Sequence, residues 1–128
     1  MFDDAASSFL YDLLSTPSPT GFEGPGQRKW AAYASQHSDS IENDAYGTTW
    51  ATLKAKKPKS GSALTVMLEA HADEIGYMIK HITKEGFLRL DRIGGSDSAT
   101  ARGRRLTILG DEGPVLGVIG NTAIHIRD

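Results

Sequence analysis

The spacing of the apolar residues changes once along this 128-residue chain, close to Ser40. Before Ser40, apolar residues recur every three or four positions, which is the period of a helix with one buried face. After Ser40, β-branched and aromatic residues alternate with polar ones or stand in short runs between glycine-containing turns, as strands do. The sequence therefore predicts an α/β fold with helices first and many short strands after them.

Two helices are predicted before Ser40. The first has an apolar stripe formed by Phe2, Ala6, Phe9, Leu10, Leu13 and Leu14. It should end near Thr16, because Pro17 and Pro19 lack a backbone N–H and bias the residues before them away from helical angles. Both acidic residues that follow Phe2 suit the positive end of this helix.

The second predicted helix runs to about His37, and its start carries two competing signals. Thr20 and Glu23 fit a capping box, whereas Pro25 suits the first helical position and would make Gly24 the cap. The sequence alone leaves both starts open. In either case we expect the buried stripe to consist of Trp30, Ala31 and Ala34.

Strands are predicted on both sides of a turn at residues 44–47, and again at residues 76–82, 87–93, 105–109 and 115–119. A polar connection at residues 54–62 precedes the nearly continuous apolar run Ala63–Leu68. Such a run is typical of a strand that is buried on both faces. We therefore expect Ala63–Leu68 to be the central strand of a sheet.

Composition excludes several classes of protein. With 14 Lys and Arg against 16 Asp and Glu, the net charge is −2, which does not fit a strongly basic nucleic-acid binder. The absence of cysteine excludes disulfides, a thiolate zinc cluster and a cysteine nucleophile. The start of the chain does not resemble a secretory signal, and no apolar run is long enough to cross a bilayer. We expect a cytoplasmic protein with neither nucleic-acid nor membrane partners.

The segment Glu69–Glu74 follows the predicted central strand directly, at the end where ligands collect in open α/β sheets. In an extended chain, His71 and Asp73 point to the same side, so a carboxylate could hold one nitrogen of a metal-bound imidazole. A surface histidine at a strand end has the same spacing. A zinc or cobalt site also needs at least three protein ligands, and His37, His81 and His125 are not at recognisable ligand spacing.

Five motifs, taken in order, resemble the M42 metallo-aminopeptidases, the glutamyl-aminopeptidase-like enzymes that form tetrahedral shells. These motifs are residues 13–23, 43–47, 67–79, 86–89 with 93–95, and 117–120 with His125. The similarity runs in register over nearly the whole chain. Five motifs in the right order are far more specific than a single His-x-Asp string.

The resemblance implies that residues 1–73 begin an α/β catalytic domain and residues 74–128 form part of a β-rich inserted dimerisation domain. It implies His71 as the first metal ligand and Asp73 as the catalytic-site carboxylate that orients it. The family enzyme would hold two divalent ions, zinc or cobalt, and hydrolyse amino-terminal residues from peptides. It would form homo-oligomers through the β-rich part.

The same resemblance implies that Asp128 falls inside the insertion, with the other ligands and the general base beyond it. We therefore expect an amino-terminal segment of such an aminopeptidase, inactive alone, that binds at most one metal ion weakly. One alternative is a non-catalytic assembly module derived from the family. A remote alternative is a glycan hydrolase that uses Glu69 with Asp73 or Glu74 and requires no metal.

Overall fold

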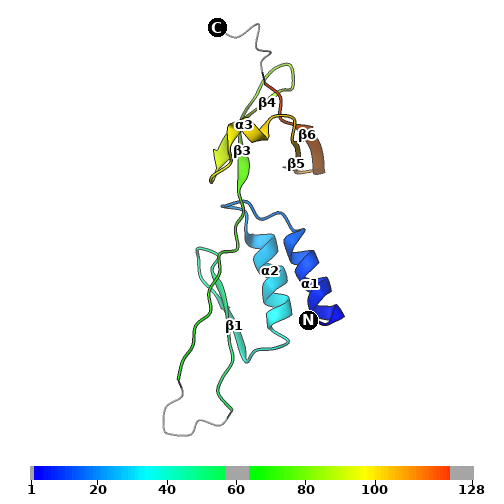
Figure 1. Ribbon diagram of the computed structural model, residues 1–128. Helices are drawn as coiled ribbons and strands as arrows, with labels where there is room; N and C mark the ends of the chain where they lie inside the picture. The colour runs from blue at the N-terminus through cyan, green and yellow to red at the C-terminus, as the bar shows by residue number, and fades with distance from the viewer. Residues whose placement is uncertain (1, 57–63, 122–128) are drawn as a thin grey trace. The chain divides into compact units, whose positions relative to one another are not determined.

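The computed structural model describes residues 2–56 and 64–121 of the chain (Figure 1). These residues form two compact units, Met1–Gly94 and Gly95–Asp128. The first unit contains the helices α1 (Asp4–Leu14) and α2 (Gly24–Ala34) and the strands β1 (Ser40–Asn43), β2 (Thr49–Thr52), β3 (Gly76–Ile82) and β4 (Leu88–Ile93). The second contains α3 (Ser98–Ala101), β5 (Arg105–Gly110) and β6 (Gly113–Val118). The predicted mixture of helices and strands is confirmed.

Helix α1 lies where its apolar stripe predicts it. The Asp3 side chain caps its start by accepting a hydrogen bond from the backbone N–H of Ala6 at 2.7 Å. The helix ends at Leu14, shortly before the two prolines. It packs beside α2, where the rings of Phe9 and Tyr33 stack with centroids 3.8 Å apart (Figure 1).

Helix α2 starts by neither of the two predicted signals. Glu23 is the capping residue, Gly24 is the first helical residue, and the Glu23 side chain makes no capping hydrogen bond. Instead, Glu23 accepts a hydrogen bond from the N–H of Gly21 at 2.7 Å. The capping box fails because the Thr20 hydroxyl bonds elsewhere, as described below. The helix ends at Ala34 rather than near His37.

The strands form three separate antiparallel hairpins, β1–β2, β3–β4 and β5–β6. Ser40 pairs with Thr52, Gly76 with Ile93, and Arg105 with Val118. In the turn of the first hairpin, Asp44 Oδ1 accepts hydrogen bonds from two backbone N–H groups, and Gly47 adopts φ +90°. The turn and the strands on both sides of it lie where the sequence predicts them.

The prediction of a central strand at Ala63–Leu68 is wrong. Residues 64–68 form no strand, and Ala63 lies outside the described residues. Four of the apolar side chains are largely exposed: Leu64 at 90%, Val66 at 71%, Met67 at 81% and Leu68 at 93%. A strand needs a neighbour for its backbone hydrogen bonds, and no described segment lies in a ladder with this one.

Burial is correspondingly slight. Ala101 is the buried apolar residue among those described, and Trp30, Ala31 and Ala34 are only half-buried. The described residues therefore enclose no large apolar core. The structure also contains the one-turn helix α3 where only strands and turns were expected. Asp97 caps it by accepting from the N–H of Ala99 at 2.8 Å, and four residues are too few to show a period.

The predicted boundary between residues 1–73 and 74–128 concerns where a domain is inserted, and it stays a prediction. Among the helices of the described part, none is long and apolar enough to span a membrane. His125 and residues 57–62 of the predicted polar connection lie outside the described residues.

Candidate functional site

The candidate site is built where the loop between α1 and α2 meets the segment that leads into β3. Pro19 and Glu74 form an isolated parallel β-bridge. In it, the N–H of Glu74 donates to the carbonyl of Ser18 at 2.8 Å, and the N–H of Thr20 donates to the carbonyl of Glu74 at 3.3 Å. The prolines at positions 17 and 19 favour the extended backbone that such a bridge requires.

Ser18 is buried at this bridge and stabilises it through hydrogen bonds. It is only 7% exposed, and each of its polar groups is used. Its N–H donates to Glu74 Oε1 at 2.9 Å, and its hydroxyl donates to the carbonyl of Ala72 at 2.8 Å. The loop at Pro19 and the start of β3 at Gly76 approach each other closely. A Cβ added to Gly76 would lie 2.8 Å from Pro19 Cβ, so glycine is needed at this position.

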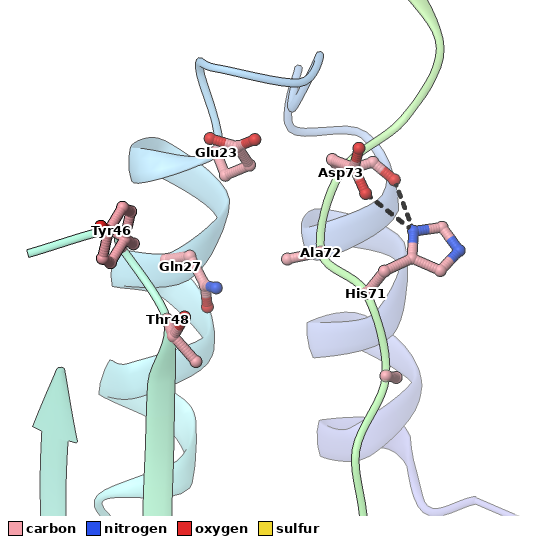
Figure 2. A pocket seen from close by; sticks show the side chains of 9 residues that line it. Glu23, Gln27, Tyr46, Thr48, His71, Ala72 and Asp73 are labelled. Carbon is pink, nitrogen blue, oxygen red and sulfur yellow. Dashed lines mark hydrogen bonds and ion pairs between the residues drawn. The ribbon is translucent and has the colours of Figure 1, made fainter. Parts of the chain in front are cut away.

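Next to the bridge, three side chains form a hydrogen-bonded series. The Thr20 hydroxyl donates to Asp73 Oδ2 at 2.6 Å. His71 Nδ1 lies 3.0 Å from Asp73 Oδ1 and 2.9 Å from the Asp73 carbonyl oxygen. The predicted contact between the His71 and Asp73 side chains is therefore present, and Figure 2 shows the His71 ring nitrogen facing the oxygens of Asp73.

The two oxygens facing Nδ1 determine which ring nitrogen of His71 carries a proton. Both are acceptors, so Nδ1 must be the donor. In the neutral ring, Nε2 then has a free lone pair, which is the state that binds metals. The His71 side chain is 85% exposed and that of Asp73 is 36% exposed, so this nitrogen is accessible.

The hydrogen bond from Thr20 holds the pKa of the Asp73 carboxyl below its usual value, and the hydrogen bond with His71 lowers this pKa further. Asp73 is therefore an anion at neutral pH. A carboxylate that accepts from an imidazole N–H makes the opposite nitrogen a better electron-pair donor. The arrangement can present one oriented imidazole to a cation.

An open hollow lies beside this segment, lined by Glu23, Gln27, Tyr46, Gly47, Thr48, Ala70, His71, Ala72 and Asp73. In Figure 2 the Ala72 methyl group points towards the side of α2 and Tyr46, whereas the His71 ring points away from it. This is the alternation of an extended chain. The imidazole is therefore on the rim of the hollow.

Sequence reasoning identified His71 and Asp73, whereas it assigned Thr20 only to a helix cap. Their roles in metal binding and catalysis stay predictions. Within residues 2–56 and 64–121, no group of three or more His, Asp or Glu side chains could hold a metal ion. The repeated proline on both sides of Ser18 was the available signal that residues 17–19 are extended and can pair with another segment.

Comparison with known proteins finds relatives that match most of this chain. Over 116 residues, the chain is 34% identical to SgcX of Escherichia coli (strain K12), covering 91% of this chain and 30% of that protein. It is 31% identical to the lysyl aminopeptidase of Pyrococcus furiosus, covering 90% of this chain and 32% of the relative. The chain thus spans about a third of the length of these relatives.

Solved structures show the same fold. The TET aminopeptidase of Thaumarchaeota archaeon SCGC AB-539-E09 superimposes with a TM-score of 0.85 at 24% identity, over 98% of this chain and 34% of that one. The TET1 peptidase of Pyrococcus horikoshii, which can assemble into a tetrahedron or a large octahedral shell, superimposes with a TM-score of 0.71 at 28% identity, over 93% and 34%. Residues 51–128 match the M42 glutamyl aminopeptidase family, and the chain belongs to that family.

Proposed function

We propose that this chain supplies the first metal ligand, His71, and its orienting carboxylate, Asp73, to a dinuclear metal-dependent aminopeptidase. The observation that carries the proposal is the hydrogen bond between His71 Nδ1 and Asp73 Oδ1, which leaves Nε2 free for a cation. Membership of the M42 glutamyl aminopeptidase family supports removal of amino-terminal residues from peptides as the reaction.

The residues present fit one ligand position of such a centre. The His71 side chain is 85% exposed, and in the neutral Nδ1–H tautomer its Nε2 offers one lone pair, whereas a zinc site needs at least three protein ligands. Bound divalent ions, zinc or cobalt, would polarise the scissile carbonyl and lower the pKa of a coordinated water. His71 would contribute one nitrogen to the centre, and Asp73 would keep its ring in place. The remaining ligands and the general base would come from the parts of such an enzyme that this chain does not span, since the chain covers about a third of the matched relatives.

Zinc titration of the 128-residue chain tests the role of His71. We expect weak binding of at most one Zn²⁺ per chain, observed by calorimetry or by shifts of the imidazole resonances. His71→Ala should abolish it, and the control His81→Ala, on the exposed part of β3, should leave it unchanged. Unchanged zinc binding by His71→Ala would exclude His71 as the ligand.

Activity is tested in a second step. We expect no metal-dependent release of amino-terminal residues by the 128-residue chain alone, because a single imidazole cannot hold two ions. Detectable release would overturn this expectation. Reading the coding DNA beyond the codon for Asp128 tests whether this chain is a segment of such an aminopeptidase. The resemblance to the M42 enzymes implies that an aspartate, an adjacent glutamate pair, a further aspartate and a histidine follow in frame.

A second candidate function, as an assembly module, is favoured by the apolar surface of the β5–β6 hairpin. Val115, Leu116 and Val118 on β6 are 57%, 77% and 67% exposed, and in the described part of the chain β6 pairs only with β5. Shell formation by the Pyrococcus horikoshii relative supports homo-oligomers, and the exposed apolar side chains of β6 are the surface through which we propose that they form. Sedimentation velocity should then give one defined oligomer, which Val118→Lys dissociates; a broad mixture would contradict this function.

A further inference from the structure

We propose that Thr20 is a positioning residue for His71, acting through the Asp73 carboxylate. This inference rests on the proposed function, because the orientation of the ring matters only if His71 binds a cation. The observation behind it is that the hydroxyl of Thr20, in the loop between α1 and α2, donates a hydrogen bond to the same Asp73 carboxylate that contacts the His71 ring. The role assigned to Thr20 therefore differs from the helix-capping role that its sequence position suggests.

The first step of the argument concerns the freedom of the carboxylate. The terminal torsion of an aspartate is broad, so a carboxylate held at one oxygen can rotate. Asp73 is also more than a third exposed, so its surroundings do not fix it. With the Thr20 hydroxyl at 2.6 Å from Oδ2 and His71 Nδ1 at 3.0 Å from Oδ1, both oxygens are held, and rotation breaks one bond or the other.

The second step concerns the stability of the Thr20 position. Besides the bond from the Thr20 hydroxyl to Asp73, four hydrogen bonds join the loop to the segment at residues 72–74: two in the backbone bridge and two from Ser18. One of them comes from the backbone of Thr20 itself. The Thr20 hydroxyl and the Asp73 carboxylate are therefore carried by paired backbone rather than by two independent loops. The paired backbone therefore keeps the Thr20 hydroxyl close to the Asp73 carboxylate, which lowers the entropic cost of forming the hydrogen bond between them.

The third step concerns the imidazole. Because the His71 side chain is 85% exposed, packing contributes little to its orientation, and the hydrogen bonds to Asp73 are its main restraint. Those bonds also fix the tautomer with the proton on Nδ1. Loss of the Thr20 hydroxyl would free one carboxylate oxygen and weaken the bond between Asp73 Oδ1 and Nδ1, leaving the Asp73 carbonyl as the remaining acceptor. The ring would be held less firmly, and the tautomer in which Nε2 carries a proton and cannot bind a cation would gain population.

The experiment uses the ¹⁵N-labelled 128-residue chain without metal and reads the His71 tautomer from the ring ¹⁵N shifts. We expect the wild-type chain to hold the Nδ1–H form and Thr20→Val to populate both forms. Thr20→Ser, which keeps the hydroxyl, should restore the wild-type pattern. Thr107→Val makes the same atomic change at an exposed position of β5 and should have no effect. A purely structural role of Thr20 would not alter the tautomer.

Zinc titration of the same four proteins adds the functional readout. Loss of an outer hydrogen-bond partner of a metal-bound histidine typically weakens binding by about 10- to 100-fold, so we expect about tenfold weaker Zn²⁺ binding for Thr20→Val. Thr20→Ser and Thr107→Val should bind as the wild type does. Since Thr20 is exposed, its replacement should not unfold the chain. If the amide spectrum shows that Thr20→Val is not folded as the wild type is, Thr20→Ala is measured in its place.

The outcomes separate this inference from the proposed function. A wild-type tautomer and wild-type zinc affinity in Thr20→Val and Thr20→Ala would overturn the positioning role and leave His71 as a ligand. If Thr20→Val changes the tautomer but the wild-type chain binds no zinc at His71, the positioning role of Thr20 is supported and the metal-ligand proposal is overturned. An Nε2–H tautomer in the wild type would overturn the positioning role.

Discussion

Two adjacent segments, residues 64–68 and 71–74, differ completely in how they are held. Residues 71–74 are tied to the loop after α1 by backbone and side-chain hydrogen bonds. Residues 64–68 have the stronger strand signal in the sequence, yet they form no ladder, and Leu68 is 93% exposed. A segment is ordered by the partners available to it and not by its composition alone.

This difference matters for the candidate site. The hydrogen bonds of Ser18 and Thr20 reach the site from a loop that lies more than fifty residues earlier in the sequence. The hydrogen bonds that hold His71 and Asp73 are therefore formed although residues 64–68 form no strand. We expect changes in the bridge to disturb His71 strongly and changes at residues 64–68 to have little effect, in the order given below.

The largest effect is expected for Gly76→Ala. The new Cβ would lie 2.8 Å from Pro19 Cβ, and a proline ring cannot move aside without separating the Pro19–Glu74 bridge. Overpacking of this kind typically costs about 1–3 kcal/mol of unfolding free energy. Urea denaturation measures the loss. The control Gly95→Ala, where an added Cβ meets nothing within 4 Å, should be close to neutral; equal stability of both variants would show that the approach at Gly76 is not tight.

The second effect is expected for Ser18→Ala. Ser18 is buried, and its hydroxyl is the donor to the carbonyl of Ala72 at 2.8 Å. Removing that donor leaves a carbonyl without its partner, which costs about 1–2 kcal/mol. Denaturation of Ser8→Ala provides the control, because Ser8 is exposed on α1 and should change stability by less than about 0.5 kcal/mol. If Ser18→Ala is as stable as its control, the bridge does not depend on this hydroxyl.

Much of the local structure was predictable from the sequence because it depends on near neighbours. The hairpin turn at Asp44–Gly47 and strand β3 at Gly76–Ile82 follow from turn residues and alternation over a few positions. The spacing of His71 and Asp73 in an extended chain places both side chains on the same side, where their contact is found. These features require no knowledge of distant segments.

Two of the features that were missed depend on distant partners. The apolar run at residues 64–68 predicted burial, but burial needs a neighbouring strand that a periodicity cannot supply. The capping box of Thr20 and Glu23 was a valid local signal, yet the Thr20 hydroxyl bonds to Asp73, 53 residues later. A local motif was thus overridden by a tertiary contact.

The third effect is small and concerns Leu68→Ala. A leucine in a strand buried on both faces loses about 2–5 kcal/mol on truncation to alanine. Since Leu68 is 93% exposed, we expect a change below about 0.5 kcal/mol in the 128-residue chain. Denaturation of the variant beside the wild type measures it. A loss in the range of a buried leucine would mean that residues 64–68 do pair in solution, and the contrast between the two segments would disappear.

The smallest effect is expected from pH, through the Asp73 carboxyl. Its pKa is lowered first by the Thr20 hydrogen bond and then by the hydrogen bond with His71, so the carboxylate favours the folded chain at pH values above the ordinary aspartate pKa. That contribution is lost as the pH falls through the lowered pKa of the folded state. Thr20→Val should raise the Asp73 pKa towards its usual value, as followed by the ¹³C shift of the carboxyl group. Glu85, whose pKa is lowered mainly by a hydrogen bond from Thr83, serves as the internal control, since its titration should not change. An unmoved Asp73 pKa in Thr20→Val would mean that the hydroxyl does not bind the carboxylate in solution, and the bridge would then hold the backbone of the site without orienting His71.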